Sequence, residues 1–398
     1  MLKGALGDVR VLDLTQFEAG TTCTMMLAFL GAEVIKVESP VGGEGGRLSF
    51  SEKRNEGIDS YYFIMLNPNK KSVTLNLRKE KGIAIFQEMV KKADVVVNNF
   101  SHGTMEKLGI GYEVIGKINP RVIYAHVTGY GSYGPYHTYP CFDITAQAMG
   151  GIMSITGFPE NPPTRCGPGL GDSIAAYNLA TGICAALYYR EKTGEGQEVE
   201  VAMQDSLVNT LRPLYNFYYA QGALPQRCGN SVRGLAPWNT YRTKDGWVAI
   251  GVLTDALWEN LLRAIGKEEY IGDPRFSSPL KRGENVQVVD PLIEEWTSGR
   301  TKREAMEYLV KRDVPCGAVL DAQEILDDPH LNERGMIVEI DHPTRGRLKT
   351  LGSPIKLSKS PSRMQCSPLL GQDNEVVYRE LMGYTAEDLA RLRAEKVI

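Results

Sequence analysis

The sequence has few residues of the kinds that hold metals or build disulfide frameworks. Its 398 residues include five histidines and seven cysteines. The histidines show no metal-ligand spacing and no H-E-x-x-H, so no metal-dependent mechanism is expected. The cysteines are scattered, odd in number and without a C-x-x-C pair, which suits a reducing cytosol better than a disulfide-stapled fold. We therefore expect a cytoplasmic protein without a metal.

Large charge excesses and membrane-length apolar runs are missing as well. The net charge is −3 and no Lys/Arg block stands out, so we expect neither nucleic acid nor an anionic membrane as partner. The 17 uncharged residues 173–189 are slightly short for a membrane span and contain Asn178 and Thr181. The N-terminus leads quickly into a strand and lacks the apolar core of a signal peptide.

Several nucleotide and nucleophile motifs are also absent. No P-loop is found, and "GYGSYG" (129–134) fails the G-x-S-x-G spacing of a nucleophile elbow. The first strand–helix turn, "TQFEAGTT", offers only Gly20 where a dinucleotide site needs G-x-G-x-x-G. Glu38 ends the second strand, where an acid could bind a ribose hydroxyl. A nicotinamide oxidoreductase is thus compatible with the architecture but unsupported by the motif.

Alternating strand and helix patterns fill the first half of the chain. Such alternation predicts right-handed βαβ units and a largely parallel sheet. The predicted strands are residues 9–14, 32–39, 72–77, 94–99, 121–127 and 197–203, and the first helices are residues 21–31 and 79–93. We divide the chain into a large domain (1–221), a linker (222–238), a small α/β domain (239–313), and a linker and C-terminal part (314–398) that completes the large domain.

One carboxylate stands out at the start of the long uncharged segment. Asp172 follows Gly167, Gly169 and Gly171 and precedes a helix that is apolar on every face, a pattern typical of a buried helix. Asp is a preferred helix N-cap, which gives a purely structural interpretation. Glycines also permit close approach of a ligand, so the carboxylate could instead act as a nucleophile. The residues alone leave both interpretations open.

Motifs along nearly the whole chain resemble the class III CoA-transferases, the group of formyl-CoA transferase and carnitine CoA-transferase. The resemblance rests on "VRVLDLTQFEAG", "NNFSHGTMEKLGIGY", "INPRVIYAHVTGYGSYGP", "GLGDSIAAYNLATGICAALYYREKTGEGQEVEVAMQDS" and "SPLLGQDNEVV", and it is weakest over about 222–310. It implies a Rossmann-like large domain with a parallel sheet and a smaller α/β domain. It also implies a homodimer of interlocked, ring-like chains.

The resemblance further implies a covalent chemistry at Asp172. This residue matches the family's nucleophilic aspartate, which forms an acyl-aspartyl anhydride and then an aspartyl-CoA thioester. Gly171, with Gly167 and Gly169, would supply backbone N–H donors for the oxyanion. The thioester of coenzyme A is then a substrate, and no cofactor is permanently bound.

The CoA-binding positions carried over from the family are a mixed set. Glu18, Ser39 and Pro140 stand where formyl-CoA transferase has a glutamine, an arginine and a lysine. Asp143 is counted with the CoA site and is expected to order the site or a loop. The expected CoA-binding residues are Glu18, Ser39, Asn99, Phe100, Lys107 and Asp143.

The substrate follows less directly from the resemblance. The glycine-rich loop that formyl-CoA transferase folds over its active site has no counterpart in "CGNSVRGLAPWNTY". We therefore expect another short acyl donor, such as succinyl-CoA or acetyl-CoA, and a small carboxylic acid acceptor. Arg233 is the candidate partner of that acid, because a guanidinium binds a carboxylate bidentately.

Two alternatives remain beside CoA transfer. The α-methylacyl-CoA racemases resemble this chain, but they use a histidine where Phe142 stands, and phenylalanine cannot carry a proton. A catalytically silent CoA-binding protein is the second alternative.

Overall fold

The protein is described here by a computed structural model covering residues 4–49 and 58–398. The chain divides into two compact units. The large unit comprises residues 1–152, 166–213 and 329–398, and the small unit comprises 153–165 and 214–328. The sequence-based division placed 153–165 and 214–221 in the large domain and 314–328 in the C-terminal part, whereas all three segments belong to the small unit. Each unit is described by itself.

A six-stranded parallel sheet forms the centre of the large unit, as the strand–helix alternation predicted. Its strand order is β3-β2-β1-β4-β5-β6. The chain adds β2 and β3 on one side of β1 and then β4, β5 and β6 on the other side, so the order of the strands reverses between β1 and β4. The strands are β1 (Arg10–Asp13), β2 (Glu33–Glu38), β3 (Lys71–Thr74), β4 (Val95–Asn98), β5 (Ile123–Thr128) and β6 (Glu198–Ala202). The mixed α/β class of the large unit is thereby confirmed.

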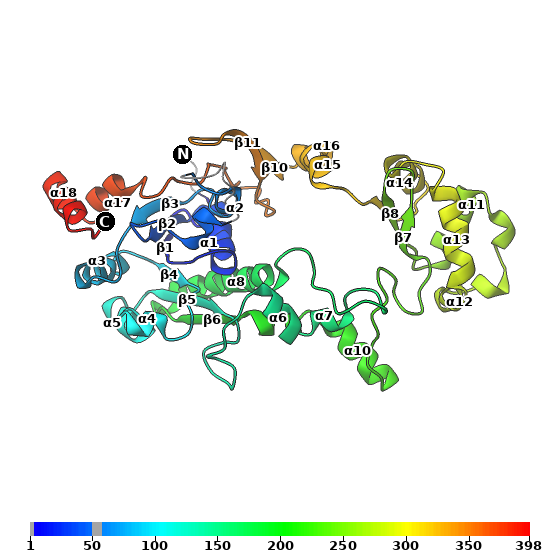
Figure 1. Cartoon of the computed structure of the whole chain (residues 1–398), viewed down its shortest axis with the longest axis horizontal. Helices are drawn as coiled ribbons and strands as arrows, with labels where there is room; N and C mark the ends of the chain where they lie inside the picture. The colour runs from blue at the N-terminus through cyan, green and yellow to red at the C-terminus, as the bar shows by residue number, and fades with distance from the viewer. Residues whose placement is uncertain (1–3, 50–57) are drawn as a thin grey trace. The chain divides into compact units, whose positions relative to one another are not determined.

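Helices cover both faces of this sheet (Figure 1). Successive strand residues point to opposite faces, so Val11 and Val97 pack with one layer while Leu12 and Val96 pack with the other. One layer contains α1 (Ala19–Phe29) and α8 (Leu170–Thr193), and the other contains α3 (Glu80–Val90), α5 (Tyr112–Ile118), α17 (Asn374–Glu380) and α18 (Ala386–Ala394). Strands buried on both faces explain the near-continuous apolar runs of the sequence.

Shorter elements complete the large unit. They are η1 (Gly45–Leu48), α2 (Tyr61–Leu66), α4 (Thr104–Lys107), α6 (Asp143–Met149), α9 (Met203–Val208), α16 (Pro329–Glu333) and the antiparallel pair β10 (Ile337–His342) and β11 (Gly346–Leu351). None of the helices in the described ranges is long and apolar enough to cross a membrane.

The expectation of a wholly buried α8 is wrong for the isolated chain. Ala175, Ala176 and Leu179 are buried against the sheet layer, but the opposite side of the helix is open. Tyr188 is 68% exposed there, and Tyr177 and Tyr189 are about half exposed. The sequence does not reveal this open face because it carries tyrosine, asparagine, alanine and threonine rather than charges.

The small unit has its own sheet and core. Its sheet is antiparallel in the order β7-β8-β9, and Val248 and Ile250 of that sheet pack on Trp258 and Leu261 of the first long helix. The elements are α10 (Arg212–Gln221, which begins at the unit boundary), β7 (Trp238–Arg242), β8 (Trp247–Gly251), α11 (Asp255–Ile265), η3 (Glu268–Tyr270), η4 (Pro274–Phe276), α12 (Pro279–Glu284), α13 (Val286–Thr297), α14 (Lys302–Val310), β9 (Cys316–Ala318) and α15 (Ala322–Leu326). The short α7 (Ile152–Ile155) lies at the other unit boundary.

Candidate active site

The loops that follow β1 and β4 meet at the reversal point of the sheet. In open α/β sheets this crevice, at the carboxyl ends of the strands, is where ligands bind. Asn99 joins the two loops, because its Nδ2 donates to the Gln16 carbonyl at 2.7 Å and its Oδ1 accepts from the Gln16 N–H at 2.8 Å. The side chain of Asn99 therefore fixes the loop that carries residues 16–18.

A buried ion network supports the same loop from below. Lys36 Nζ donates to the Thr15 carbonyl at 2.8 Å, and Lys70 Nζ donates to Asp13 Oδ2 at 3.0 Å and to the Thr21 carbonyl at 3.1 Å. Burial opposes ionisation of Asp13, yet Lys36 and Lys70, together with hydrogen bonds from Thr15 and Thr24, outweigh it and bring the pKa of this carboxyl to about 2. The β1–α1 loop is thus held by two buried lysines whose charges are balanced by Asp13 and by hydrogen bonds to backbone carbonyls.

Two adjoining pockets open at this edge of the sheet. The strand-end pocket has a volume of about 630 Å³ and is lined by residues including Ser39, Leu75, Arg78 and Thr104. The aspartate pocket has a volume of about 440 Å³ and is lined by residues including Glu18, Asn99, His102, His137, Phe142 and Asp172. Gln16 and Phe100 line both pockets. A long ligand can therefore extend from one pocket into the other.

Asp172 lies in the first turn of α8 and not at its N-cap, which is Gly169. A Cβ on Gly169 would stand 3.3 Å from Asp172 Oδ2 and 3.2 Å from each carboxylate oxygen of Glu18. Both carboxylates thus border the same glycine, and a side chain there would crowd them. The N-cap interpretation of Asp172 is therefore wrong, and a larger residue at position 169 would require the two carboxylates to shift by a few tenths of an ångström.

Burial and neighbouring charge change the acidity of this carboxyl. Burial is the larger cause, and the negative charges of Glu18 and Asp143 add to it, so that the pKa of Asp172 rises to about 7. Burial also raises the pKa of Glu18, which accepts hydrogen bonds from Ser173 Oγ at 3.2 Å and Tyr62 Oη at 3.3 Å. The site is a group of carboxyls that cannot all ionise easily together.

Asp143 and Gln147 of α6 anchor the segment that leads into α8. The Gly171 N–H donates to Asp143 Oδ1 at 2.9 Å, Gln147 Nε2 donates to Asp143 Oδ2 at 2.8 Å, and the Cys166 N–H donates to Gln147 Oε1 at 2.8 Å. Asp143 accepts the Gly171 N–H in this structure, so the expected role of Gly171 as an oxyanion donor would require this bond to be exchanged. Asp143 orders the loop before Asp172.

The other residues expected to bind CoA or the acceptor acid lie in the pockets, on the short helix α4 and in the small unit. Ser39 lines the strand-end pocket and Phe100 lines both pockets. Lys107 ends the short helix α4 and is exposed, next to Leu108 of the strand-end pocket. Arg233 is exposed in the small unit.

Sequence reasoning missed Tyr62, Gln147, His102 and His137. Tyr62 contacts Glu18, 44 residues away, and Gln147 holds the Cys166 N–H, 19 residues away, so neither contact leaves a local signal in the sequence. The two histidines were considered only as metal ligands. No group of three or more histidine, cysteine or carboxylate side chains suited to a metal is found within residues 4–49 and 58–398.

Comparison with known proteins gives a consistent result. The family model described as CoA-transferase family III matches residues 6–374. A formyl-CoA:oxalate CoA-transferase of Bradyrhizobium diazoefficiens is 39% identical over 97% of this chain and 95% of its own. One of Streptomyces coelicolor is 38% identical over 100% of both chains. The crystal structure of a CAIB/BAIF family protein from Brucella suis has a TM-score of 0.85, with 31% identity over 95% of this chain and 100% of that one.

Proposed function

The chain belongs to CoA-transferase family III, and from that premise we propose that Asp172 is the nucleophile through which it moves CoA between two carboxylic acids. The observation that carries the assignment is the position of Asp172. It lies in a pocket continuous with a second pocket at the reversal point of the sheet, and its half-buried carboxyl has a pKa of about 7. A carboxylate of higher basicity is a stronger nucleophile once it is ionised.

The proposed sequence uses two anhydrides and one thioester. The Asp172 carboxylate attacks the donor thioester, giving a mixed anhydride and CoA thiolate. The thiolate attacks the aspartyl carbonyl of that anhydride, which releases the donor acid and leaves aspartyl-CoA. The acceptor carboxylate then attacks aspartyl-CoA, releasing thiolate and forming a second anhydride. The thiolate attacks the acceptor carbonyl, so acceptor-CoA leaves and the Asp172 carboxylate is regenerated.

Positioning is the main contribution that the protein makes to these steps. Anhydride, thioester and carboxylate are of comparable reactivity, and fixed geometry can supply about 7–11 kcal/mol of such a barrier. The Asn99–Gln16 pair and the Asp143–Gln147 anchor hold the two loops that border the reacting groups. Enclosure in a pocket also limits hydrolysis of the intermediates.

The donor is a short acyl-CoA and the acceptor a small carboxylic acid. Succinyl-CoA and acetyl-CoA are the first donors to test, with dicarboxylates and 2-hydroxy acids as acceptors. Formyl-CoA and oxalate join the panel, because two relatives at 38–39% identity are named formyl-CoA:oxalate CoA-transferase. Arg233 is proposed to bind the acceptor acid, and an unchanged acceptor KM in Arg233→Ala would contradict that role.

A trapping experiment tests the nucleophile and identifies the donor together. The protein is incubated with each acyl-CoA, quenched with hydroxylamine or borohydride, and mapped by peptide mass spectrometry. We expect a donor-dependent adduct at Asp172 and none in Asp172→Ala. Turnover without an adduct would contradict the covalent mechanism.

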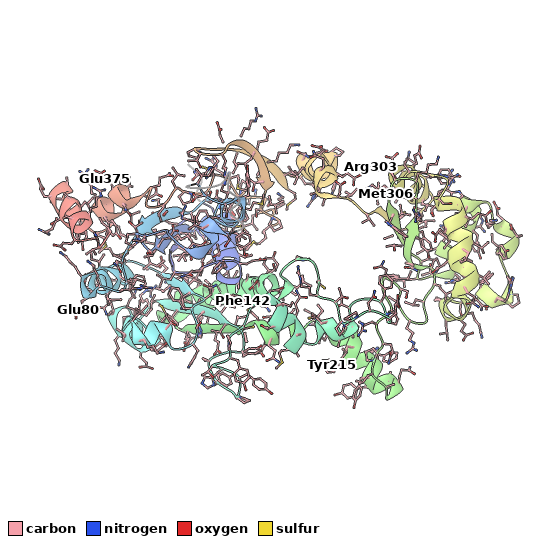
Figure 2. The ribbon with its side chains drawn as sticks, viewed as in Figure 1. Glu80, Phe142, Tyr215, Arg303, Met306 and Glu375 are labelled. Carbon is pink, nitrogen blue, oxygen red and sulfur yellow. The ribbon has the colours of Figure 1, made fainter. Side chains whose placement is uncertain are left out.

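The two alternatives give different results in the same assays. Racemisation of a 2-methylacyl-CoA without an aspartyl adduct would indicate the racemase branch. That reaction lacks a base at Phe142, whose ring is 76% exposed beside α6 (Figure 2). Binding of CoA without any turnover would indicate a silent CoA-binding protein.

The functional molecule is proposed to be a cytoplasmic homodimer. The open face of α8 carries Tyr177, Tyr188 and Tyr189, and α10 carries the exposed Tyr215, Tyr218 and Tyr219. Exposed aromatic surface of this kind marks an interaction site. Light scattering that finds a stable monomer would contradict the dimer.

A further inference from the structure

Two imidazole rings stand together on the wall of the aspartate pocket. His102 follows β4 and His137 precedes α6, and both line this pocket. Their ring centroids are 4.8 Å apart and their planes are 87° apart, so one ring meets the other edge to face. His137 Nδ1 lies 2.7 Å from the Gly134 carbonyl oxygen. A carbonyl only accepts, so Nδ1 carries a proton and Nε2 remains for a ligand.

Basic side chains are scarce around the two pockets. Among the described residues that line them, only Arg78, in the strand-end pocket, and His102 and His137, in the aspartate pocket, are basic. A CoA thioester carries a 3′-phosphate on its nucleotide and a diphosphate between the nucleotide and the pantetheine arm. Phosphate oxygens are bound best by N–H donors on charged groups. Among the lining residues these three side chains are the candidate phosphate partners, and the exposed Lys107 lies next to Leu108 of the strand-end pocket.

We propose that the His102–His137 pair binds the diphosphate of CoA, an inference that rests on the CoA-transfer function proposed above. His102 lies two residues beyond Phe100, which lines both pockets, so the pair is close to their junction. The thioester end of the ligand has to reach Asp172 in the same pocket as the histidines. Arg78, in the other pocket, is left for the nucleotide end.

The rest of the site supports a phosphate ligand over a role at the nucleophile. Burial, Glu18 and Asp143 account for the shifted pKa of Asp172, and no imidazole takes part. Neither ring is paired with a carboxylate in the part of the chain that the structure describes. With its Nδ1–H held by Gly134, His137 presents Nε2 to the ligand.

Binding measurements that need no turnover test the pair. The variants are His102→Ala, His137→Ala and the double variant, and the ligands are CoA, 3′-dephospho-CoA and pantetheine. The double variant is expected to bind CoA and dephospho-CoA at least about tenfold more weakly, because two imidazole–phosphate contacts are lost, and to bind pantetheine as the wild type does. His330→Ala, an exposed histidine on α16, serves as the matched control.

A lysine variant separates phosphate binding from a role in shaping the pocket. His102→Lys should retain most of the CoA affinity, since an ammonium also binds phosphate, whereas His102→Gln should not. Unchanged CoA affinity in the double variant would overturn the proposal. The proposal would also be overturned if the variants lost affinity for pantetheine as well, or if they lost affinity for CoA but not for dephospho-CoA. A raised acceptor KM with unchanged CoA affinity would overturn it too. A missing adduct at Asp172 would instead concern the proposed mechanism, so the two failures are distinguishable.

Discussion

At the scale of the residue, the raised pKa of Asp172 makes its carboxylate more basic and also leaves a smaller fraction of it ionised at neutral pH. An aspartate in water is fully ionised at neutral pH but weakly basic. With a pKa of about 7, Asp172 is partly protonated at neutral pH, and its carboxylate form is the more reactive. Because the negative charge of Glu18 contributes to the raised pKa, changing this one neighbour should change the ionised fraction of Asp172.

The pH dependence of the reaction should report this balance. Only the carboxylate attacks, so kcat/KM for the donor should rise with pH through about 7 and be roughly tenfold below its plateau at pH 6. Glu18→Gln removes a negative neighbour, lowers the pKa of Asp172 and should move the rise to lower pH. Identical profiles for the wild type and Glu18→Gln would refute this, and Glu191→Gln, at the exposed end of α8, is the control.

The same carboxyl should cost stability at neutral pH. Its folded-state pKa lies above the unfolded value, so the stability it contributes is complete below about pH 4 and is lost as the pH rises to about 7. Asp172→Asn should therefore melt at a higher temperature than the wild type, with a difference that grows between pH 4 and 7. The difference above pH 7 is at most about 4 kcal/mol, at 1.36 kcal/mol per pKa unit. A difference in melting temperature between Asp172→Asn and the wild type that stays the same from pH 4 to pH 7 would contradict the expectation.

At the scale of the element, the start of α8 depends on α6. The chain before α8 is glycine-rich and is fixed by Asp143 and Gln147 rather than by a regular structure of its own. The side chain of Gln147 is fully buried while it makes these bonds. A buried polar group left without partners is costly, so this anchor has to remain complete.

Gln147→Leu should disrupt the anchor. It removes the buried Gln147 amide that accepts from the half-buried Cys166 N–H, and it should lower the free energy of unfolding by about 1–3 kcal/mol. We expect kcat to fall while the affinity for CoA is unchanged, because Asp172 is displaced and the strand-end pocket is not. Gln204→Leu, which loses one surface hydrogen bond to Met149, is the matched control. A normal kcat in Gln147→Leu would show that the anchor is dispensable.

At the scale of the whole molecule, the C-terminal helices α17 and α18 pack against the sheet formed by the first half of the chain. Val377, Tyr378, Leu389 and Leu392 of α17 and α18 are buried in one helical layer of the sheet. The segment before α17 also protects the outer edge of β3, since the Ser72 N–H donates to Asp373 Oδ2 at 2.8 Å. Covering an edge strand in this way prevents its pairing with other chains.

Deletion of residues 374–398 should therefore unfold or aggregate the protein. Each large apolar side chain contributes about 1.5–3 kcal/mol on burial, so losing four or more is comparable to the whole stability of a domain. Tyr378→Phe, which loses only the hydrogen bond to the Thr74 carbonyl, should fold normally and be destabilised by about 1 kcal/mol. A truncated chain that remains soluble and melts at the wild-type temperature would disprove this.

The sequence by itself determined the six strands of the large unit and their parallel sheet, and it singled out Asp172 as the candidate nucleophile. Periodicity along the chain encodes which residues face a core, and ordered motifs over nearly the whole length indicated the family. It also led to one error, a wholly buried α8. This error concerns what lies next to a residue rather than what the residue is.

Only the tertiary structure decided how the site works. Glu18 and Ser173 are 155 residues apart in sequence and 3.2 Å apart in space, between Ser173 Oγ and Glu18 Oε1, and the carboxylate of Asp172 stands beside the same glycine as Glu18. The raised pKa of Asp172 and the facing rings of His102 and His137 arise in the same way, from segments distant in the chain. Burial and electrostatic interactions depend on distances in space, and these are fixed only when the chain folds.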